Sequence, residues 1–225
     1  AVQPGADVAF WVTLGEVRAE AGDAQGALEA WRRVIDRDRS DPDGWLEVAS
    51  ACWDYFLFDD AIDVIAEERR VLGDPDLHAK QLAAVHESKR DYKPAITEYV
   101  RILQEGDVAV REDVRVRLNY LSRRKGLDRP IRKAFRKAIK ADPGHEGLYR
   151  NYADYLARLE EWDRAMDVYD EARDNVRDRR FLEWVDGEFE RLERFDGAEE
   201  AYADLAVTYA SDPDAWNAYL AYVSR

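Results

Sequence analysis

The chain has 225 residues, of which 46% are hydrophobic and 36% are charged, and its formal net charge at pH 7 is −14. This composition excludes a disordered chain, which has too few apolar residues, and a membrane-spanning chain, which needs about 20 consecutive apolar residues. A single cysteine, Cys52, excludes an internal disulfide and a multi-cysteine metal site. With three histidines and no nucleotide-binding or hydrolase motif, the sequence predicts neither an enzyme nor a bound cofactor or metal.

A repeated pattern of a turn, an alanine and a bulky residue four positions later organises the chain. The segments that begin at Gly22, Arg90 and Glu160 align on this pattern without gaps. Sliding the frame along the chain places repeat starts at 8, 42, 76, 112, 146, 179 and 213. Such a period is typical of stacked helix pairs. We therefore expect an N-terminal linker over residues 1–7 and a repeat array over residues 8–225, which ends in one extra helix from 213.

The spacing within each repeat has a physical basis. A small residue is needed where two helices approach closely, and a bulky residue one turn later fills the gap to the next repeat. Asp-Pro pairs near the repeat junctions stop one helix and suit the first turn of the next. The fourth repeat is the least regular, because a two-residue insertion precedes it. The predicted alanines of the second helices are Ala27, Ala61, Ala95, Ala165 and Ala198, with Ile131 as the exception.

These residues resemble the tetratricopeptide repeat (TPR) family, a helix–turn–helix repeat, over residues 8–225. The family's small eighth position is Gly15, Ala49, Ala83 and Ala153 here, whereas Asn119 and Asp186 depart from it. The resemblance implies an all-α fold, a right-handed α-solenoid (superhelix) of helix–turn–helix repeats. The run from Trp184 to Phe189 and the pair Trp216 and Tyr219 also resemble the half-a-TPR variant of RNA-processing scaffolds.

In TPR proteins, fixed positions of the first helices line a concave groove that binds a peptide or helix. In the first two repeats these positions include Ala9, Val12, Glu16 and Asp43. The resemblance therefore implies a non-catalytic scaffold or adaptor that binds a protein or peptide partner, as part of a larger protein or complex. Two aromatic residues of the predicted groove, Trp53 and Tyr120, either face the groove or pack inside the array. The groove residues that we predict are Leu46, Ser50, Trp53, Leu77, Lys80, Glu87, Val116, Tyr120, Arg123, Arg150 and Asp154.

Charge is unevenly distributed along the chain. Residues 1–75 and 142–225 are strongly acidic, whereas the segment from Arg115 to Lys140 is strongly basic. This segment is either a solvated helix face attracted to acidic neighbouring repeats or a docking surface for RNA or an acidic partner. The two acidic flanks argue against a long nucleic acid, because they repel its phosphates. The basic residues are Arg115, Arg123, Arg124, Lys125, Arg129, Arg132, Lys133, Arg136, Lys137 and Lys140.

Both end helices carry apolar residues on more than one face, which is typical of an interface. Phe10 and Trp11 at one end, and Trp216, Tyr219 and Tyr222 at the other, indicate either a longer array or self-association. A third hypothesis is a regulatory module of an enzyme whose catalytic domain lies outside this chain. The first residue is not Met, so we expect a processed or excised end. The composition favours a soluble, cytoplasmic and bacterial protein, or a periplasmic one if a signal segment was removed.

Overall fold

The computed structural model describes residues 7–105, 108–191 and 195–224, and these residues form an all-α fold without strands. Residues 1–6 of the predicted linker and the side chain of Ala198 lie outside this description. The chain divides into two compact units, Ala1–Ile131 and Arg132–Arg225. The helices of the first unit are α1 (Val8–Glu20), α2 (Ala24–Arg37), α3 (Pro42–Asp54), α4 (Phe58–Leu72), α5 (Ala79–Ser88), α6 (Tyr92–Glu105) and α7 (Val108–Ser122).

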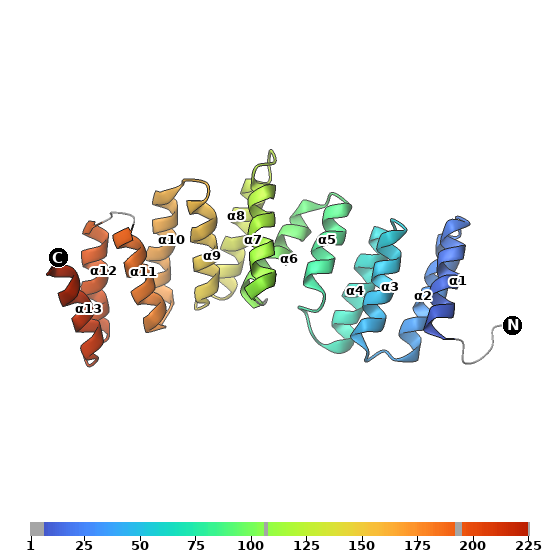
Figure 1. Cartoon of the computed structure of the whole chain (residues 1–225), viewed down its shortest axis with the longest axis horizontal. Coiled ribbons are helices and arrows are strands. Elements are labelled where there is room, and N and C mark those ends of the chain that lie inside the picture. The colour runs from blue at the N-terminus through green and yellow to red at the C-terminus, as the bar shows by residue number, and fades with distance from the viewer. Residues whose placement is uncertain (1–6, 106–107, 192–194, 225) are drawn as a thin grey trace. The chain divides into compact units, whose positions relative to one another are not determined.

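Helix α8 (Asp128–Ala141) crosses the boundary between the units. The second unit continues with α9 (Glu146–Ala157), α10 (Trp162–Asn175), α11 (Arg179–Arg191), α12 (Phe195–Thr208) and α13 (Pro213–Val223). Consecutive helices such as α1 and α2, α3 and α4, and α9 and α10 lie side by side as helix–turn–helix pairs (Figure 1). The prediction of an all-α solenoid of such pairs is confirmed. None of the helices in the described ranges has the length and apolar character needed to cross a bilayer.

Aspartate side chains begin several of these helices. Asp41 accepts a hydrogen bond from the backbone N–H of Asp43, and Asp212 accepts one from that of Asp214. In both cases a proline, Pro42 or Pro213, is the first residue of the helix, where its missing N–H is not needed. The Asp-Pro pairs therefore place the starts of α3 and α13 at the residues that the repeat frame indicates.

Two first helices begin away from the frame. Helix α5 begins at Ala79 rather than at 76, because residues 75–78 form a turn in which Asp74 accepts the N–H of Asp76. His78 closes that turn in the left-handed region, with φ of 50°. Helix α7 begins at Val108 rather than at 112, since no helix-breaking residue follows Gly106 and the inserted residues extend the helix. The division of the array into individual repeats stays a prediction.

The turns inside the helix pairs share one backbone conformation. Gly22, Phe56, Arg90, Gly126 and Glu160 all have positive φ, between 61° and 88°, and follow one another at 34 to 36 residues. Only glycine adopts this region without strain. Phe56, Arg90 and Glu160 are therefore held there by the packing of the helices on either side.

We expect Glu160→Gly to raise the free energy of unfolding by about 0.5 kcal/mol, because relief of the left-handed strain exceeds the entropy that glycine adds to the unfolded chain. Ala157→Gly, in the last turn of α9, is the matched control and should lower stability by about 1 kcal/mol. Urea denaturation of both variants measures the difference. Equal destabilisation by both would contradict the strain at residue 160.

The first pair is packed around a glycine. Trp31 of α2 is fully buried, and its Nε1 donates a hydrogen bond to the carbonyl oxygen of Val12 at 3.1 Å. The indole lies directly against Gly15 of α1, where an added Cβ would be 2.1 Å from Nε1. Trp31 also contacts Tyr55 at the end of α3, with a ring separation of 5.6 Å. One side chain therefore joins the two helices of the first pair to the second pair.

Gly15→Ala should lower the free energy of unfolding by about 1–3 kcal/mol, because the new methyl group overlaps an indole that has no free space to move into. Gly187→Ala in α11 is the control, since no atom lies within 4 Å of its Cβ position, and it should stabilise by about 0.5–1 kcal/mol. Thermal unfolding followed by circular dichroism compares the two. A neutral Gly15→Ala variant would refute the close approach of Trp31.

Candidate functional site: an acidic cleft between the first helices

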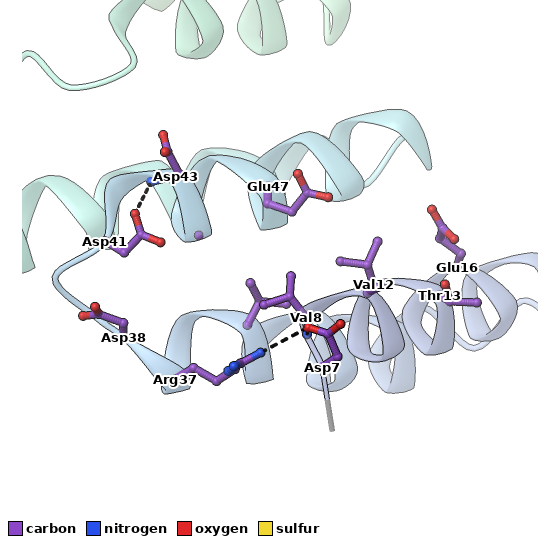
Figure 2. A pocket seen from close by; sticks show the side chains of 13 residues that line it. Asp7, Val8, Val12, Thr13, Glu16, Arg37, Asp38, Asp41, Asp43 and Glu47 are labelled. Atoms are coloured by element: carbon purple, nitrogen blue, oxygen red, sulfur yellow. Dashed lines mark hydrogen bonds and ion pairs between the residues drawn. The ribbon is translucent and has the colours of Figure 1, made fainter. Parts of the chain in front are cut away.

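A cleft of about 810 Å³ opens between α1 and α3, with α2 beneath it (Figure 2). We call it the acidic cleft. It lies where the first two repeats meet, so its two long walls come from equivalent first helices. The lining residues are Asp7, Val8, Ala9, Val12, Thr13 and Glu16 of the first segment, Val34 and Arg37 of α2, and Asp38, Asp41, Asp43, Gly44 and Glu47 of the third segment.

Six carboxylates and one guanidinium line the acidic cleft. Arg37 pairs with Asp7 across 3.7 Å, and both side chains are largely exposed. Asp41 caps α3, and Ser40 donates two hydrogen bonds to Asp38, which hold the pKa of Asp38 below its ordinary value. The other three, Glu16, Asp43 and Glu47, form no ion pair within 4.0 Å among the described residues. Their charges therefore remain available to a ligand. Figure 2 shows Glu16 and Glu47 on opposite walls of the cleft.

The floor of the cleft is apolar. Val34 of α2 is buried, Val12 is half-buried and Val8 is 36% exposed. Lysine and arginine side chains combine a methylene stem with a charged end, so they match an apolar floor with an acidic rim. The arrangement is therefore suited to a basic, partly apolar polypeptide segment.

Four positions that the TPR pattern assigns to the first helices of the first two repeats line this cleft, namely Ala9, Val12, Glu16 and Asp43. None of the eleven residues that we predict as the partner groove lines it. Among the carboxylates of the cleft, the pattern missed Asp38, Asp41, Glu47 and Asp7. The signal for the first two was the run of aspartates between 36 and 43, which also serves to end α2 and to begin α3. Glu47 carried no signal, because an isolated glutamate on a helix is ordinary.

The predicted groove residues of α3 and α5 lie at the junction of the second and third pairs. Leu46 and Ser50 are half-buried, and Trp53 donates from Nε1 to Ser88 Oγ at 3.1 Å. Leu77 precedes α5, and its carbonyl oxygen accepts a 2.9 Å hydrogen bond from Arg69 Nε. Trp53 is therefore partly exposed and also contacts the next repeat. Its environment combines the two alternatives, exposure in the groove and packing inside the array.

Glu87 and Lys80 of α5 contact α7. The Glu87 carboxylate pairs with Arg117 and accepts a 2.7 Å hydrogen bond from Tyr99, and these partners hold its pKa below the ordinary value although burial opposes them. Lys80 Nζ lies 3.0 Å from Asp113. Arg117 also stacks on Tyr120, with its guanidinium 4.9 Å from the ring. These charges stabilise the stack, which leaves them less available to a partner.

The remaining predicted groove residues differ in exposure. Val116 and Tyr120 are 59% and 54% exposed, and Arg123 is exposed. In the second unit, the Arg150 guanidinium lies 4.2 Å from the centre of the Trp184 ring, and Asp154 pairs with Arg158 at 3.0 Å. Arg150 is therefore part of the packing between α9 and α11. Groove binding by this whole set stays a prediction.

Some residues of the predicted basic segment contact an acidic or aromatic side chain, and others have no acidic partner among the described residues. Arg115 pairs with Glu112, Arg124 stacks on Tyr92, and Arg136 pairs with Glu171. Arg132 holds Glu161 with two hydrogen bonds of 2.7 and 2.6 Å. The others are exposed and have no acidic partner within 4.0 Å among the described residues: Arg123, Lys125, Arg129, Lys133, Lys137 and Lys140.

Apolar side chains are exposed at both predicted ends. Phe10 is 46% exposed and packs edge-on against the half-buried Trp11 at 5.2 Å. On α13, Trp216 is 40% exposed, whereas Tyr222 stacks on Tyr202 at 5.0 Å. Tyr219 is half-buried. The exposed stripe of α13 therefore consists of Trp216, Leu220 and Val223, and the two tyrosines contribute less of it than predicted.

A family model described as tetratricopeptide repeat matches residues 12–75 and 132–179, about half of the chain. The chain belongs to the tetratricopeptide repeat family. The matched residues of this TPR protein include most of those that line the acidic cleft, most of α8, and the whole of α9 and α10. The resemblance inferred from Gly15, Ala27 and their equivalents is thus confirmed.

Solved structures similar to this TPR protein include two TPR proteins and a pilus biogenesis factor. A thermophilic TPR protein of Thermus thermophilus has 16% identity and a TM-score of 0.35, and the match covers 97% of this chain and 100% of that one. A TPR protein of Parabacteroides merdae has 14% identity, a TM-score of 0.38 and coverages of 96% and 84%. PilW, a type IV pilus biogenesis factor, has 11% identity, a TM-score of 0.39 and coverages of 93% and 97%. No curated protein matches the chain significantly.

The contact between Arg132 and Glu161 makes stability depend on pH. Hydrogen bonds from Arg132, supported by Arg164, lower the pKa of Glu161 to about 2. A carboxylate with a lowered pKa stabilises the fold above its ordinary pKa, and this contribution is lost as the pH falls toward 2. We expect Glu161→Gln to lower the free energy of unfolding by about 1 kcal/mol at pH 7, allowing for partial exposure, and to have no effect near pH 2. Glu160→Gln is the control and should have no effect at either pH; chemical denaturation at both values provides the test.

Proposed function

We propose that this TPR protein is a non-catalytic protein–protein interaction scaffold that binds a basic, partly apolar segment of a partner protein in the acidic cleft. The observation that supports the proposal is the combination of three unpaired carboxylates, Glu16, Asp43 and Glu47, with an apolar floor. A helix or peptide that presents lysine or arginine beside apolar side chains satisfies both parts.

Charge beyond the cleft favours the same class of partner. Residues 1–75 hold 17 acidic and 7 basic side chains, so the field around the cleft is negative. Such a field speeds the encounter with a basic partner and is screened by salt over about 8–10 Å at ordinary ionic strength. The rigid walls of the cleft also mean that little entropy is lost in ordering the receptor on binding.

The basic face of α8 supports a second candidate. Arg129, Lys133, Lys137 and Lys140 follow one another at helical spacing and are exposed, so they project from one side of the helix. An acidic protein segment or RNA is the ligand that this face would bind. The third hypothesis, a module that regulates a catalytic domain outside this chain, stays a prediction to which we assign no residue.

Binding of a fluorescein-labelled amphipathic peptide, with lysine and leucine at helical spacing, tests the acidic cleft. Replacement of Glu16 and Glu47 by Gln and of Asp43 by Asn should weaken binding at least about tenfold at low salt, because three charge-assisted contacts are lost. Asp41 is kept, since it caps α3. Fluorescence anisotropy gives the dissociation constants.

The matched control changes three exposed carboxylates outside the cleft, Glu29, Asp54 and Asp63, to their amides. It alters the net charge by the same amount. If the control weakens binding as much as the cleft variant, general charge attraction explains the binding and the cleft proposal is wrong. A fluorescein-labelled acidic peptide that binds more tightly than the basic one would instead favour the α8 face.

A further inference from the structure

Asp186 of α11 is a buried carboxylate without a hydrogen-bonding partner. It is 1% exposed, and neither Oδ1 nor Oδ2 accepts a hydrogen bond from the described residues. The equivalent residue is small in four other first helices, namely Gly15, Ala49, Ala83 and Ala153, whereas Asn119 is a second departure. An unsatisfied buried carboxylate destabilises a fold, so its presence here is a departure with a cost.

Asp186 can be compared with two other buried carboxylates of the described residues, Glu68 and Glu98. Glu68 is fully buried, and its Oε1 lies 3.0 Å from His78 Nε2. Glu98 is 8% exposed and is paired with Arg69 at 2.9 Å. For Asp186 the nearest cation is Arg173, whose Nε is 4.0 Å from Oδ1. Asp186 therefore lies farther from its nearest cation than Glu98 does, and like Glu68 it accepts no hydrogen bond from the described residues.

Asp186 lines a cavity of about 520 Å³ between α10, α11 and the end of α12. Three more carboxylates, Asp170, Asp174 and Asp204, line it, against the guanidiniums of Arg173 and Arg177. The walls also include Leu182 and Leu205, which are buried. The cavity therefore combines a net negative charge with an apolar surface.

The two guanidiniums of the cavity are already engaged. Arg173 Nη2 lies 3.2 Å from Asp204 and Nη1 lies 3.6 Å from Asp170, so Asp186 receives only its distant Nε. Arg177 Nη1 contacts the carbonyl oxygen of Arg173 at 3.5 Å. Asp174 has no ion pair within 4.0 Å among the described residues. An additional cation can thus bind without displacing an existing strong pair.

We propose that this cavity binds the guanidinium group of an arginine side chain from a partner protein, with Asp186 as the buried acceptor and Asp174 and Asp204 beside it. Arginine fits because its fork of donors can reach several carboxylates while its stem contacts Leu182 and Leu205. A compact metal ion lacks such a stem and would leave the apolar wall without a partner. The proposal concerns the second unit and does not depend on the acidic cleft.

The ionisation of Asp186 agrees with this assignment. Burial raises its pKa to about 7, Arg173 of α10 opposes the shift, and Asp204 of α12 and Glu183 of α11 add to it. At neutral pH the empty site is therefore partly protonated. An arginine in the cavity favours the ionised carboxylate, so binding should release a proton and lower this pKa.

NMR spectroscopy of the carboxyl carbon of Asp186 tests the proposal, with the capped tripeptide acetyl-Gly-Arg-Gly-amide as the probe. Saturating peptide should lower the apparent pKa of Asp186 by about one unit or more, whereas acetyl-Gly-Gln-Gly-amide should leave it unchanged. Asp186→Asn should weaken binding of the arginine peptide at least about tenfold. An unchanged Asp186 resonance at saturating peptide would overturn the proposal.

The control is Asp167→Asn, which removes an exposed carboxylate of α10 outside the cavity and should alter binding less than about twofold. Asp204→Asn is a second test at an exposed position and should weaken binding about threefold or more without affecting folding. If all three variants bind the peptide like the unchanged protein, the cavity is not the site. The cleft variant at Glu16, Asp43 and Glu47 should bind this peptide normally, which separates the two proposals.

Discussion

The close approach of two helices at a residue without a side chain is the constraint on which the first unit depends. Trp31 can be fully buried against α1 only because Gly15 leaves room for the indole. From that position the ring also reaches Tyr55 of the next pair, so the packing inside one repeat determines the contact to its neighbour. The walls of the acidic cleft are α1 and α3, whose separation this contact helps to set.

Ion pairs between successive repeats account for much of the uneven charge. Arg32 with Glu67, Arg69 with Glu98, and Arg132 with Glu161 are each separated by 29 to 35 residues, close to one repeat. Arginines of one pair thus meet glutamates of the next. Part of the basic segment between Arg115 and Lys140 stabilises the stack in this way, and the residues left over lie in the turn before α8 and on the exposed face of α8.

The acidic cleft and the cavity at Asp186, to which we assign ligands, both contain carboxylates without a close cationic partner. In the acidic cleft the unpaired carboxylates are at the rim, where water solvates them at little cost. Asp186 is different, because it is buried and its ionised form is disfavoured until a cation arrives. A buried carboxylate that accepts no hydrogen bond is less favourable there than the small residue found in four other repeats, and such a departure is characteristic of a functional position.

The amino-acid sequence by itself determined the helix pairs and much of their register. Aspartate caps, proline at the first helical residue, and a small residue opposite a large one act within one repeat or between neighbours, so a constant spacing reveals them. It also indicated Val12, Glu16 and Asp43 as surface positions of the first helices, which the cleft then used. Only the tertiary structure decided which charges are free. Arg132 and Lys133 are adjacent and carry the same charge, yet one contacts Glu161 and the other points to solvent, because the direction of each side chain and the distance to the next repeat select the partner.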